Sequence, residues 1–462
     1  MIGGELDPFR PALRPEFAAD LEQMAGATRY ELDLQLDPST LEISGDGVVH
    51  YTNREDVALD AVYFRLYPNF PGCHGQAEVT AVQAGGETVK PAYQVERTAL
   101  RVPLDPPLEP GEAVVLDLHF EVEVPEGDLC RYGDFSYSGG IMALAHFYPI
   151  IPAYDDEGWN IELGPSYGDL VYADASLYHV TMTLPAGWVV AASGTEVSRT
   201  SLDEGRARIS WVSGPGRDFF MALSRDYLTR TQEVGDVQVT AYFLSGDRAG
   251  GEQALDYAVR ALQLYQKRFG PYRYREFDVV ETPTLAGGIE YPGVVVIAGS
   301  MYGSEGGYLE VTVVHEAAHQ WWYNLIGDDQ VDEPWLDEAL ATYSSIVFFE
   351  EEESAAAGES LLRYYRGSYQ AMVDGGQDAP VNRPVGAYDE NQYYAIVYAK
   401  GALFFDALRR EVGDRAFWAI LQRYYERYLY GIASGEGLLQ VAEEVSGKDL
   451  QGLYERWILS PQ

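Results

Sequence analysis

The sequence contains few cysteines and no long apolar run. Two cysteines in 462 residues, Cys73 and Cys130, are too few for a disulfide scaffold and badly spaced for a zinc knuckle, so we expect structural thiols, unpaired or joined once. No stretch approaches the roughly 18 apolar residues that span a bilayer, so no transmembrane segment is expected. The first residues lack the basic and apolar regions of a signal peptide. We therefore expect a soluble protein, either cytoplasmic or the mature part of an exported protein whose signal was removed.

Basic residues are also scarce. The chain has 32 Lys and Arg against 72 Asp and Glu, a formal net charge of −40. Such a charge repels the phosphates of nucleic acids and anionic lipids, so no nucleic-acid partner is expected. It attracts cationic or amine-bearing ligands instead.

The pattern of apolar residues predicts a β-rich first half. A chain of 462 residues, at roughly 100 to 200 residues per domain, allows two or three domains. After a helix expected at 15–24, short runs such as YELDLQLD and YHVTMTLP alternate apolar and polar residues and end in Gly, Pro, Asp or Asn. Residues 1–228 are therefore expected to form an antiparallel β-rich domain.

The second half, residues 229–462, is dominated by longer helical periods. Strands are expected at VQVTAYFL, REFDVVET and YPGVVVIAG, so this domain is expected to be α+β. The acidic run at 350–353 and the AAAG that follows it are expected to be the solvated end of a helix. Helices are expected at 252–268, 308–324, 334–350, 393–411 and 416–427.

The pentapeptide HEAAH at 315–319 is a candidate metal site. His315 and His319 are four residues apart in a segment without a helix breaker from Val311 onward, so both imidazoles share one helical face. Two ligands of one metal require this geometry, and Glu316 lies close enough to reach a metal-bound water. A single histidine on an apolar helix face is more often a buried structural residue, but the pair favours a metal.

A site with two histidines needs a third protein donor, and zinc hydrolases commonly supply a carboxylate while leaving the fourth position to water. Glu338 follows His319 with 18 residues between them, in DEPWLDEALATY. Asp332 is expected to cap a helix there, with Pro334 in its first turn and Glu338 one turn in. Taken alone, a glutamate at this position is more often a surface helix carboxylate than a ligand.

Together these segments resemble the gluzincin aminopeptidases of the aminopeptidase N and leukotriene hydrolase type. HEAAHQWW and the Glu of PWLDEALATY have that family's spacing. GGIEY at 287–291 resembles its Gly-x-Met-Glu-Asn exopeptidase motif, and YAKG at 398–401 resembles its Tyr-Glu-Lys-Gly segment. The resemblance implies an antiparallel, saddle-like β-rich domain at 1–228 and a thermolysin-like zinc peptidase domain at 229–462.

The resemblance also implies a zinc chemistry. One Zn²⁺ per chain would be held by His315, His319 and Glu338 and would activate a water for attack on a peptide carbonyl. Glu316 would be the general base that takes the proton of this water and passes it to the leaving amine. Tyr398 would donate a hydrogen bond to the oxyanion.

The same resemblance implies an exopeptidase. Glu290 would pair with the free α-amino group of the substrate, and Gly287 and Gly288 would contact the substrate backbone. The expected function is a zinc-dependent aminopeptidase that hydrolyses N-terminal residues from peptides, with peptides bearing a free N-terminus as its partners.

The sequence departs from the family pattern in three places, and two other functions stay open. Ile289 and Tyr291 replace the usual Met and Asn, and Ala339 replaces a Gly. The chain ends 124 residues after Glu338, so we expect a short form without the long helical C-terminal domain and with a more open cleft.

One alternative is a thermolysin-like endopeptidase in which Glu290 is an exposed residue of a glycine turn entering an edge strand. The other is a catalytically silent binding protein that keeps the fold.

Overall fold

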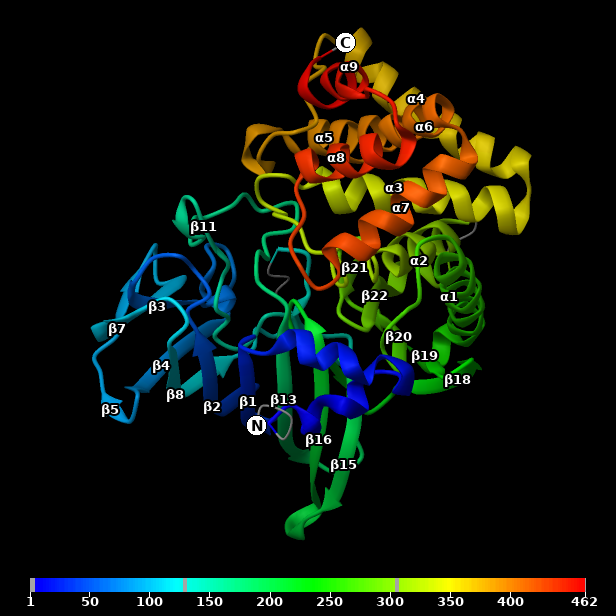
Figure 1. Cartoon of the computed structure of the whole chain (residues 1–462). Coiled ribbons are helices and arrows are strands. Elements are labelled where there is room, and N and C mark those ends of the chain that lie inside the picture. The colour runs from blue at the N-terminus through cyan, green and yellow to red at the C-terminus, as the bar shows by residue number, and fades with distance from the viewer. Residues whose placement is uncertain (1–4, 128–130, 304–306, 462) are drawn as a thin grey trace. The chain divides into compact units, whose positions relative to one another are not determined.

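The computed structural model describes residues 5–127, 131–303 and 307–461 (Figure 1). Cys130 lies outside these residues, so the expectation about the two cysteines stays a prediction. The predicted boundary at 228 falls inside the first of two compact units and, as a domain boundary, also stays a prediction. The first unit comprises Met1–Leu163, Ala173–Leu255 and Arg273–Glu305, and the second comprises Gly164–Tyr172, Asp256–Tyr272 and Gly306–Gln462.

An eight-stranded sheet is the largest element of the first unit, with the order β15-β16-β13-β1-β2-β8-β4-β5 (Figure 1). Neighbouring strands are antiparallel except β1 and β13, which run parallel. Alternate residues of β1 are buried, as its alternating sequence predicts. The strands are β1 (Arg29–Asp37), β2 (Glu42–Thr52), β4 (Gln76–Ala84), β5 (Glu87–Thr88), β8 (Ala113–Glu123), β13 (Ser176–Pro185), β15 (Thr195–Ser201) and β16 (Arg206–Gly216).

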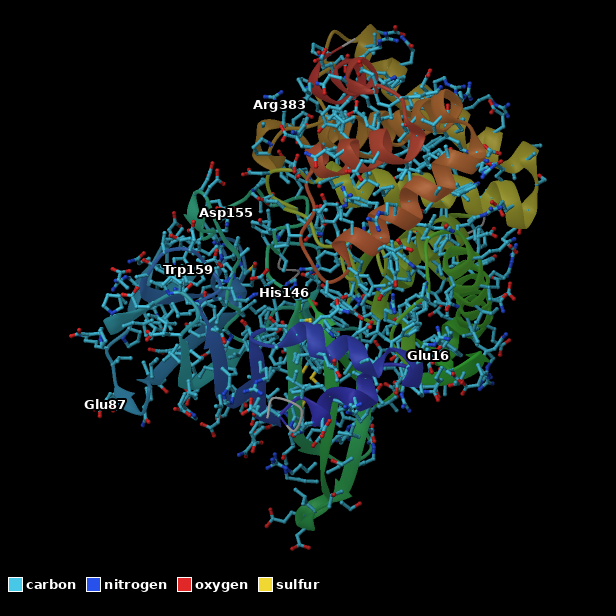
Figure 2. The ribbon with its side chains drawn as sticks, viewed as in Figure 1. Glu16, Glu87, His146, Asp155, Trp159 and Arg383 are labelled. Atoms are coloured by element: carbon cyan, nitrogen blue, oxygen red, sulfur yellow. The ribbon has the colours of Figure 1, made fainter. Side chains whose placement is uncertain are left out.

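Smaller elements complete the β-rich part of this unit. The helix expected at 15–24 is present as a 3-10 helix, η2 (Pro15–Met24). Trp159, labelled in Figure 2, lies 5.3 to 6.0 Å from the rings of Tyr51, Tyr63 and Tyr154. The remaining elements are η1 (Asp7–Ala12), β3 (Leu59–Arg65), η3 (Tyr67–Asn69), β6 (Ala92–Gln94), β7 (Ala99–Leu108), β9 (Phe135–Ser138), β10 (Ile141–Leu144), β11 (Tyr154–Asp155), β12 (Gly158–Trp159), β14 (Val189–Ala192), η4 (Asp203–Gly205) and β17 (Met221–Ser224).

A five-stranded sheet with the order β18-β19-β20-β22-β21 also belongs to the first unit. Strands β19, β20 and β22 are parallel, and β18 and β21 pair antiparallel at the two edges. One apolar cluster joins this sheet to β10 and β17, and in it Tyr291 stacks on Phe220 with ring centroids 4.2 Å apart. The bounds are β18 (Leu228–Val234), β19 (Val237–Phe243), η5 (Ser245–Asp247), β20 (Glu276–Thr282), β21 (Gly288–Tyr291), β22 (Val294–Ala298) and η6 (Gly299–Met301).

The second unit is helical. Helix α1 (Arg248–Arg268) begins in the first unit and ends in the second, and all residues of α3 (Trp335–Phe348) are buried. Helices α2 (Tyr308–Ala318) and α6 (Gly401–Val412) both pack against α3. Among the described residues, no helix is long and apolar enough to cross a membrane. The other helices are η7 (Phe349–Glu353), α4 (Ala355–Asp374), η8 (Val385–Ala387), α5 (Glu390–Tyr393), η9 (Tyr394–Lys400), α7 (Asp414–Tyr428), α8 (Gly435–Ser446), α9 (Gln451–Tyr454) and η10 (Glu455–Leu459).

The strands and most of the helices expected from the sequence are present, but the expected extent of α2 is wrong. The helix ends at Ala318 and does not continue to Asn324. Tyr323 has a φ of 126°, outside the helical region, and the backbone N–H of Asn324 donates to the carbonyl of His319. The chain therefore turns directly after the second histidine.

Two expectations about helix starts are also wrong. Asp332 does not cap α3, because Pro334 is its N-cap residue and Asp329 Oδ1 accepts the N–H of Asp332. The AAAG at 355–358 is not a solvated helix end but the first turn of α4, where the Ser354 side chain accepts the N–H of Ala357. Helix α8 was not expected, although Ser434 is a favourable N-cap residue whose side chain accepts the N–H of Gly437.

Candidate metal centre

The two histidines of HEAAH lie where α2 ends. His315 is in the last turn, and His319 is the C-cap residue. The apolar residues of this segment are buried, and the Tyr265 hydroxyl donates to the carbonyl of Val314 at 2.9 Å, which ties α2 to α1. The two Nε2 atoms lie 3.2 Å apart, as the spacing of four residues predicts for one helical face.

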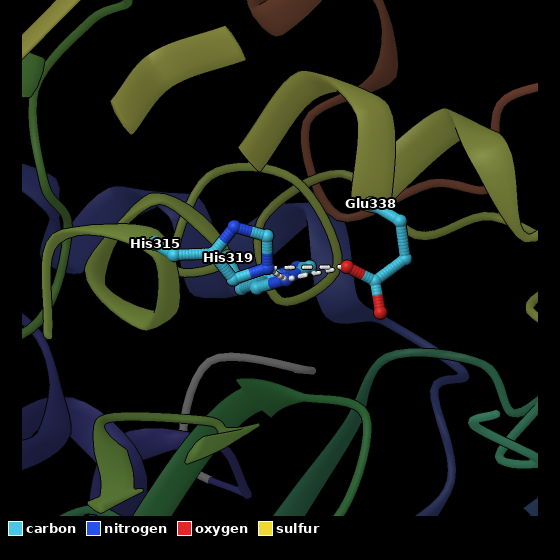
Figure 3. Close-up of side chains that lie close together, drawn as sticks. All are labelled: His315, His319 and Glu338. Carbon is cyan, nitrogen blue, oxygen red and sulfur yellow. Dashed lines mark hydrogen bonds and ion pairs between the residues drawn. The ribbon is translucent and has the colours of Figure 1, made fainter. Parts of the chain in front are cut away.

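Glu338 lies in the first turn of α3, and its residue is only 3% exposed. Its Oε2 atom is 3.2 Å from Nε2 of His315 and 3.5 Å from Nε2 of His319 (Figure 3). The structure therefore brings two imidazole nitrogens and one carboxylate oxygen into a triangle with sides of 3.2, 3.2 and 3.5 Å.

This triangle fits a tetrahedral zinc ion. Zinc bonds of about 2.0 to 2.1 Å at tetrahedral angles place neighbouring donors about 3.3 to 3.4 Å apart. Nδ1 of His319 lies 2.9 Å from the carbonyl oxygen of Trp322, which only accepts, so Nδ1 carries the proton and Nε2 offers its lone pair. Three converging lone pairs are favourable only with a cation among them. The sides of 3.2 to 3.5 Å and the chemistry of the donor set favour zinc.

The charge states of the ligands agree with this assignment. Burial lowers the pKa of His315, which favours the neutral imidazole that a metal requires. Burial would raise the pKa of Glu338, but the adjacent His315 and His319 side chains outweigh this and hold that pKa below the usual value. Glu338 is therefore a carboxylate.

Tyr398 reaches the same centre from the π-helix η9. Its hydroxyl donates a hydrogen bond to Oε1 of Glu338, the oxygen that the histidines leave free. Its ring stacks on His315 with centroids 5.9 Å apart and an interplanar angle of 18°. π-Helical turns are rare and frequently occur at functional sites. The structure thus brings together four of the residues singled out from the sequence.

Glu316 is buried on α2 between the two histidines. Burial raises the pKa of its carboxyl, His319 opposes this, and the charges of Glu338, Asp169 and Asp337 add to it, so that the pKa is about 8. A cation at the three donor atoms would act against this rise. Glu316 is thus a carboxyl whose proton affinity the surroundings increase.

The GGIEY segment lies in the first unit. Residues Gly288–Tyr291 form β21, an edge strand in which Glu290 pairs with Val295 of β22. The carbonyl of Gly287 accepts the N–H of Ala298 at 3.0 Å. The alternative interpretation of this segment was a glycine turn that enters an edge strand with an exposed Glu. The strand is an edge strand, but Glu290 is only 6% exposed.

The model of the peptidase family M1 domain matches residues 253–457. This part of the chain is similar to the peptidase family M1 domain. The match confirms the resemblance to the gluzincin aminopeptidases, and His315, Glu316, His319, Glu338 and Tyr398 all lie inside the matched residues.

The similar proteins of known sequence are aminopeptidases. Aminopeptidase N of Lactococcus lactis subsp. lactis is 30% identical over 225 residues, which are 45% of this chain and 26% of the relative. Aminopeptidase M1-C of Oryza sativa subsp. japonica is 28% identical over 492 residues, which are 98% of this chain and 51% of the relative. The chain thus spans between about a quarter and about half the length of these two relatives.

Solved structures of similar extent confirm the fold. The M1 zinc metallopeptidase from Deinococcus radiodurans has a TM-score of 0.74 and 21% identity, with 95% of this chain and 94% of that chain covered. A mutant of the same protein bound to a Tyr-Ser-Ala substrate has a TM-score of 0.71 and 22% identity, with 94% and 93% covered. The predicted β-rich N-terminal part followed by a peptidase domain is therefore correct.

Two acidic residues near Glu316 and Glu338 were not predicted from the sequence. Asp337 is buried, and its oxygens accept from Gln330 Nε2 at 2.8 Å and from the N–H of Glu338 at 2.6 Å. Burial raises the pKa of Asp337 to about 8. The charge of Asp169 raises the pKa of both Glu316 and Asp337. The pair DE at 337–338 could have drawn attention to Asp337.

No sequence signal marks Asp169. It lies outside the matched M1 domain, in Gly164–Tyr172, the part of the N-terminal half that belongs to the second unit. The Tyr167 hydroxyl donates to the carbonyl of Tyr388. Gly168, at a φ of 73°, packs closely against Val385, because a Cβ atom on Gly168 would lie 2.7 Å from Cγ1 of Val385. These contacts hold Asp169 in the catalytic unit.

Proposed function

We propose that the protein is a zinc-dependent aminopeptidase that removes N-terminal residues from peptides. The triangle of His315, His319 and Glu338, with sides of 3.2 to 3.5 Å, is the observation that carries the proposal. The names of the aminopeptidase relatives and the peptide substrate of the Deinococcus radiodurans mutant support it. One Zn²⁺ per chain would be held by these three residues.

The chain's own residues supply the proton transfers. When bound, the zinc ion polarises the scissile carbonyl and activates a water. Glu316, with its raised proton affinity, takes the proton of the attacking water and delivers it to the leaving amine. The hydroxyl of Tyr398 donates to Oε1 of Glu338 in the structure, and it turns to donate a hydrogen bond to the carbonyl oxygen as negative charge develops there. Its stacking on His315 orients the ring for this contact.

Substrate recognition would involve GGIEY. The carboxylate of Glu290 pairs with the free α-amino group, which restricts cleavage to the first residue, and Gly287 and Gly288 contact the substrate backbone. The acidic chain, with its net charge of −40, attracts the protonated amine of such a peptide. The substrates are therefore peptides with a free N-terminus.

Zinc content and hydrolysis of aminoacyl anilides test the proposal together. The wild type is expected to bind about one zinc per chain. It should hydrolyse free-amine alanyl or leucyl anilides but not their N-acetylated forms. Glu316→Gln should keep the zinc and lose about 10² to 10⁴-fold in kcat. Glu310→Gln, on the same helix, is the matched control and should keep both zinc and activity, because Glu310 lies near the start of α2.

Two outcomes would contradict the proposal in different ways. Cleavage of N-acetylated peptides at internal bonds would indicate an endopeptidase and remove the role of Glu290. A zinc-loaded protein with no activity on any free-amine peptide would indicate a binding protein that keeps the fold. An unchanged rate in Glu316→Gln would remove Glu316 as the base.

A further inference from the structure

Three tyrosines of the second unit form a continuous row that begins at the candidate metal centre. We call Tyr398, Tyr394 and Tyr364 the tyrosine ladder. The Tyr398 ring stacks on His315, and the Tyr394 ring stacks on Tyr398 with centroids 5.4 Å apart and an interplanar angle of 29°. A side-chain hydrogen bond joins Tyr394 to Tyr364 on α4. The ladder therefore connects the metal centre to α4.

The ladder becomes more exposed with each step from the centre. Tyr398 is partly buried, Tyr394 is 39% exposed and Tyr364 is 59% exposed. Their sequence neighbours Tyr393 and Tyr365 are buried and do the structural packing, Tyr393 against Tyr167 and Tyr388. The two outer rings of the ladder thus contribute aromatic surface that the core does not need.

We propose that the tyrosine ladder is a binding strip for the leaving part of the substrate, where it selects aromatic side chains on the C-terminal side of the cleaved bond. This inference rests on the proposed function. An aminopeptidase has a single residue on the amine side of the scissile bond, so an open strip that extends from the metal centre over several residues faces the other side.

The dimensions of the ladder fit an extended peptide. An extended chain advances about 3.3 Å per residue, so the 5.4 Å step from the Tyr398 ring to the Tyr394 ring corresponds to about two residues. Aromatic rings prefer offset-stacked or edge-to-face partners at about 4.5 to 7 Å, and an exposed tyrosine ring offers a face for either. The hydroxyl groups add donors for the peptide backbone.

Tetrapeptides with a single aromatic residue test the strip. The parent is Ala-Ala-Ala-Ala, and phenylalanine is placed at position two, three or four, with alanyl anilide as the substrate that lacks a leaving peptide. For the wild type, kcat/KM should be highest for one or two of the phenylalanine peptides. In Tyr394→Ala and Tyr364→Ala, the ratio of kcat/KM for that peptide to kcat/KM for the parent should fall by about two- to tenfold, mainly through KM.

Two control variants separate recognition from folding. Tyr394→Phe keeps the stacking ring and should keep the wild-type ratio. Tyr308→Ala removes a tyrosine that is 61% exposed but lies at the start of α2, away from the ladder in sequence and contacts, and should also keep the wild-type ratio.

The result that overturns the strip differs from the result that overturns the function. A wild-type enzyme that cleaves the peptides, with the same ratio in Tyr394→Ala and Tyr364→Ala, shows that the ladder does not bind substrate. A wild-type enzyme that cleaves no free-amine substrate overturns the proposed function, and the strip with it.

Discussion

Replacing Lys400 with methionine should destabilise the second unit strongly. The Lys400 ammonium is fully buried and donates to Asp378 Oδ1 at 3.0 Å, to the carbonyl of Ala379 at 2.7 Å and to the carbonyl of Ser460 at 2.9 Å. All three hydrogens of the ammonium are thus satisfied. Lys400 is the last residue of η9, so this contact also anchors the π-helix that carries Tyr398.

The magnitude follows from what Lys400→Met leaves behind. Methionine keeps the length of the stem but removes the ammonium from the buried Asp378 carboxylate, which still accepts from the Tyr369 hydroxyl at 3.0 Å and from the N–H of Ala379 at 2.8 Å. Removing one member of a buried ion pair typically costs about 3 to 5 kcal/mol, because an uncompensated charge stays in the interior. We expect a decrease of this size in the free energy of unfolding, together with a lower kcat, since Tyr398 loses its anchor.

Urea unfolding followed by tryptophan fluorescence measures the effect. The midpoint should decrease at an unchanged m value. The matched variant is Lys400→Met combined with Asp378→Asn, which removes the negative charge that Lys400 balances and should lose less stability than the sum of the two single changes. A loss below about 1 kcal/mol in Lys400→Met would refute the reasoning that this buried pair stabilises the unit.

Three further predictions concern packing, pH and metal. Gly401→Ala should destabilise the folded protein by about 1 to 3 kcal/mol and weaken zinc binding, because the new Cβ would lie 2.5 Å from Cβ of Ala339, the residue after Glu338. Adding Ala339→Gly should restore both properties, as measured by denaturation and by zinc titration. Burial raises the pKa of Glu281 to about 7, so the wild type should lose stability as pH rises from about 4.5 to 7, by at most about 3 kcal/mol. Glu281→Gln, which can still accept the N–H of Leu244, should not lose stability over this range. If the stability of both proteins changes with pH in parallel, Glu281 is not the group responsible. Chelation of zinc should abolish hydrolysis and lower Tm, and added zinc should restore both; activity that persists in the metal-free protein would contradict the metal site.

The local geometry of the candidate site could be predicted from the sequence. A spacing of four residues in a helix places two side chains on one face whatever the rest of the chain does, and His315 and His319 lie as this rule requires. The alternating residues of β1 identified a half-buried strand for the same reason, because the period of a strand is set by its own backbone. The end of α2 could not be predicted, because the φ of 126° at Tyr323 contradicts its local propensity.

The positions of Glu338, Tyr398 and Asp169 depended on the tertiary structure. The sequence suggested Glu338 and Tyr398 only through resemblance to a family, since a spacing of 19 or 79 residues from His319 carries no geometry of its own. The packing of α2 and η9 against the buried helix α3 brings Oε2 of Glu338 to 3.2 Å from His315 and the Tyr398 hydroxyl to Oε1. No family motif indicated Asp169. Its charge lies near Glu316 because Gly164–Tyr172 contacts the other segments of the second unit. Local periodicity depends only on neighbouring residues and can be predicted from the sequence. Contacts between side chains that are distant in sequence depend on how whole helices pack to bury their apolar faces.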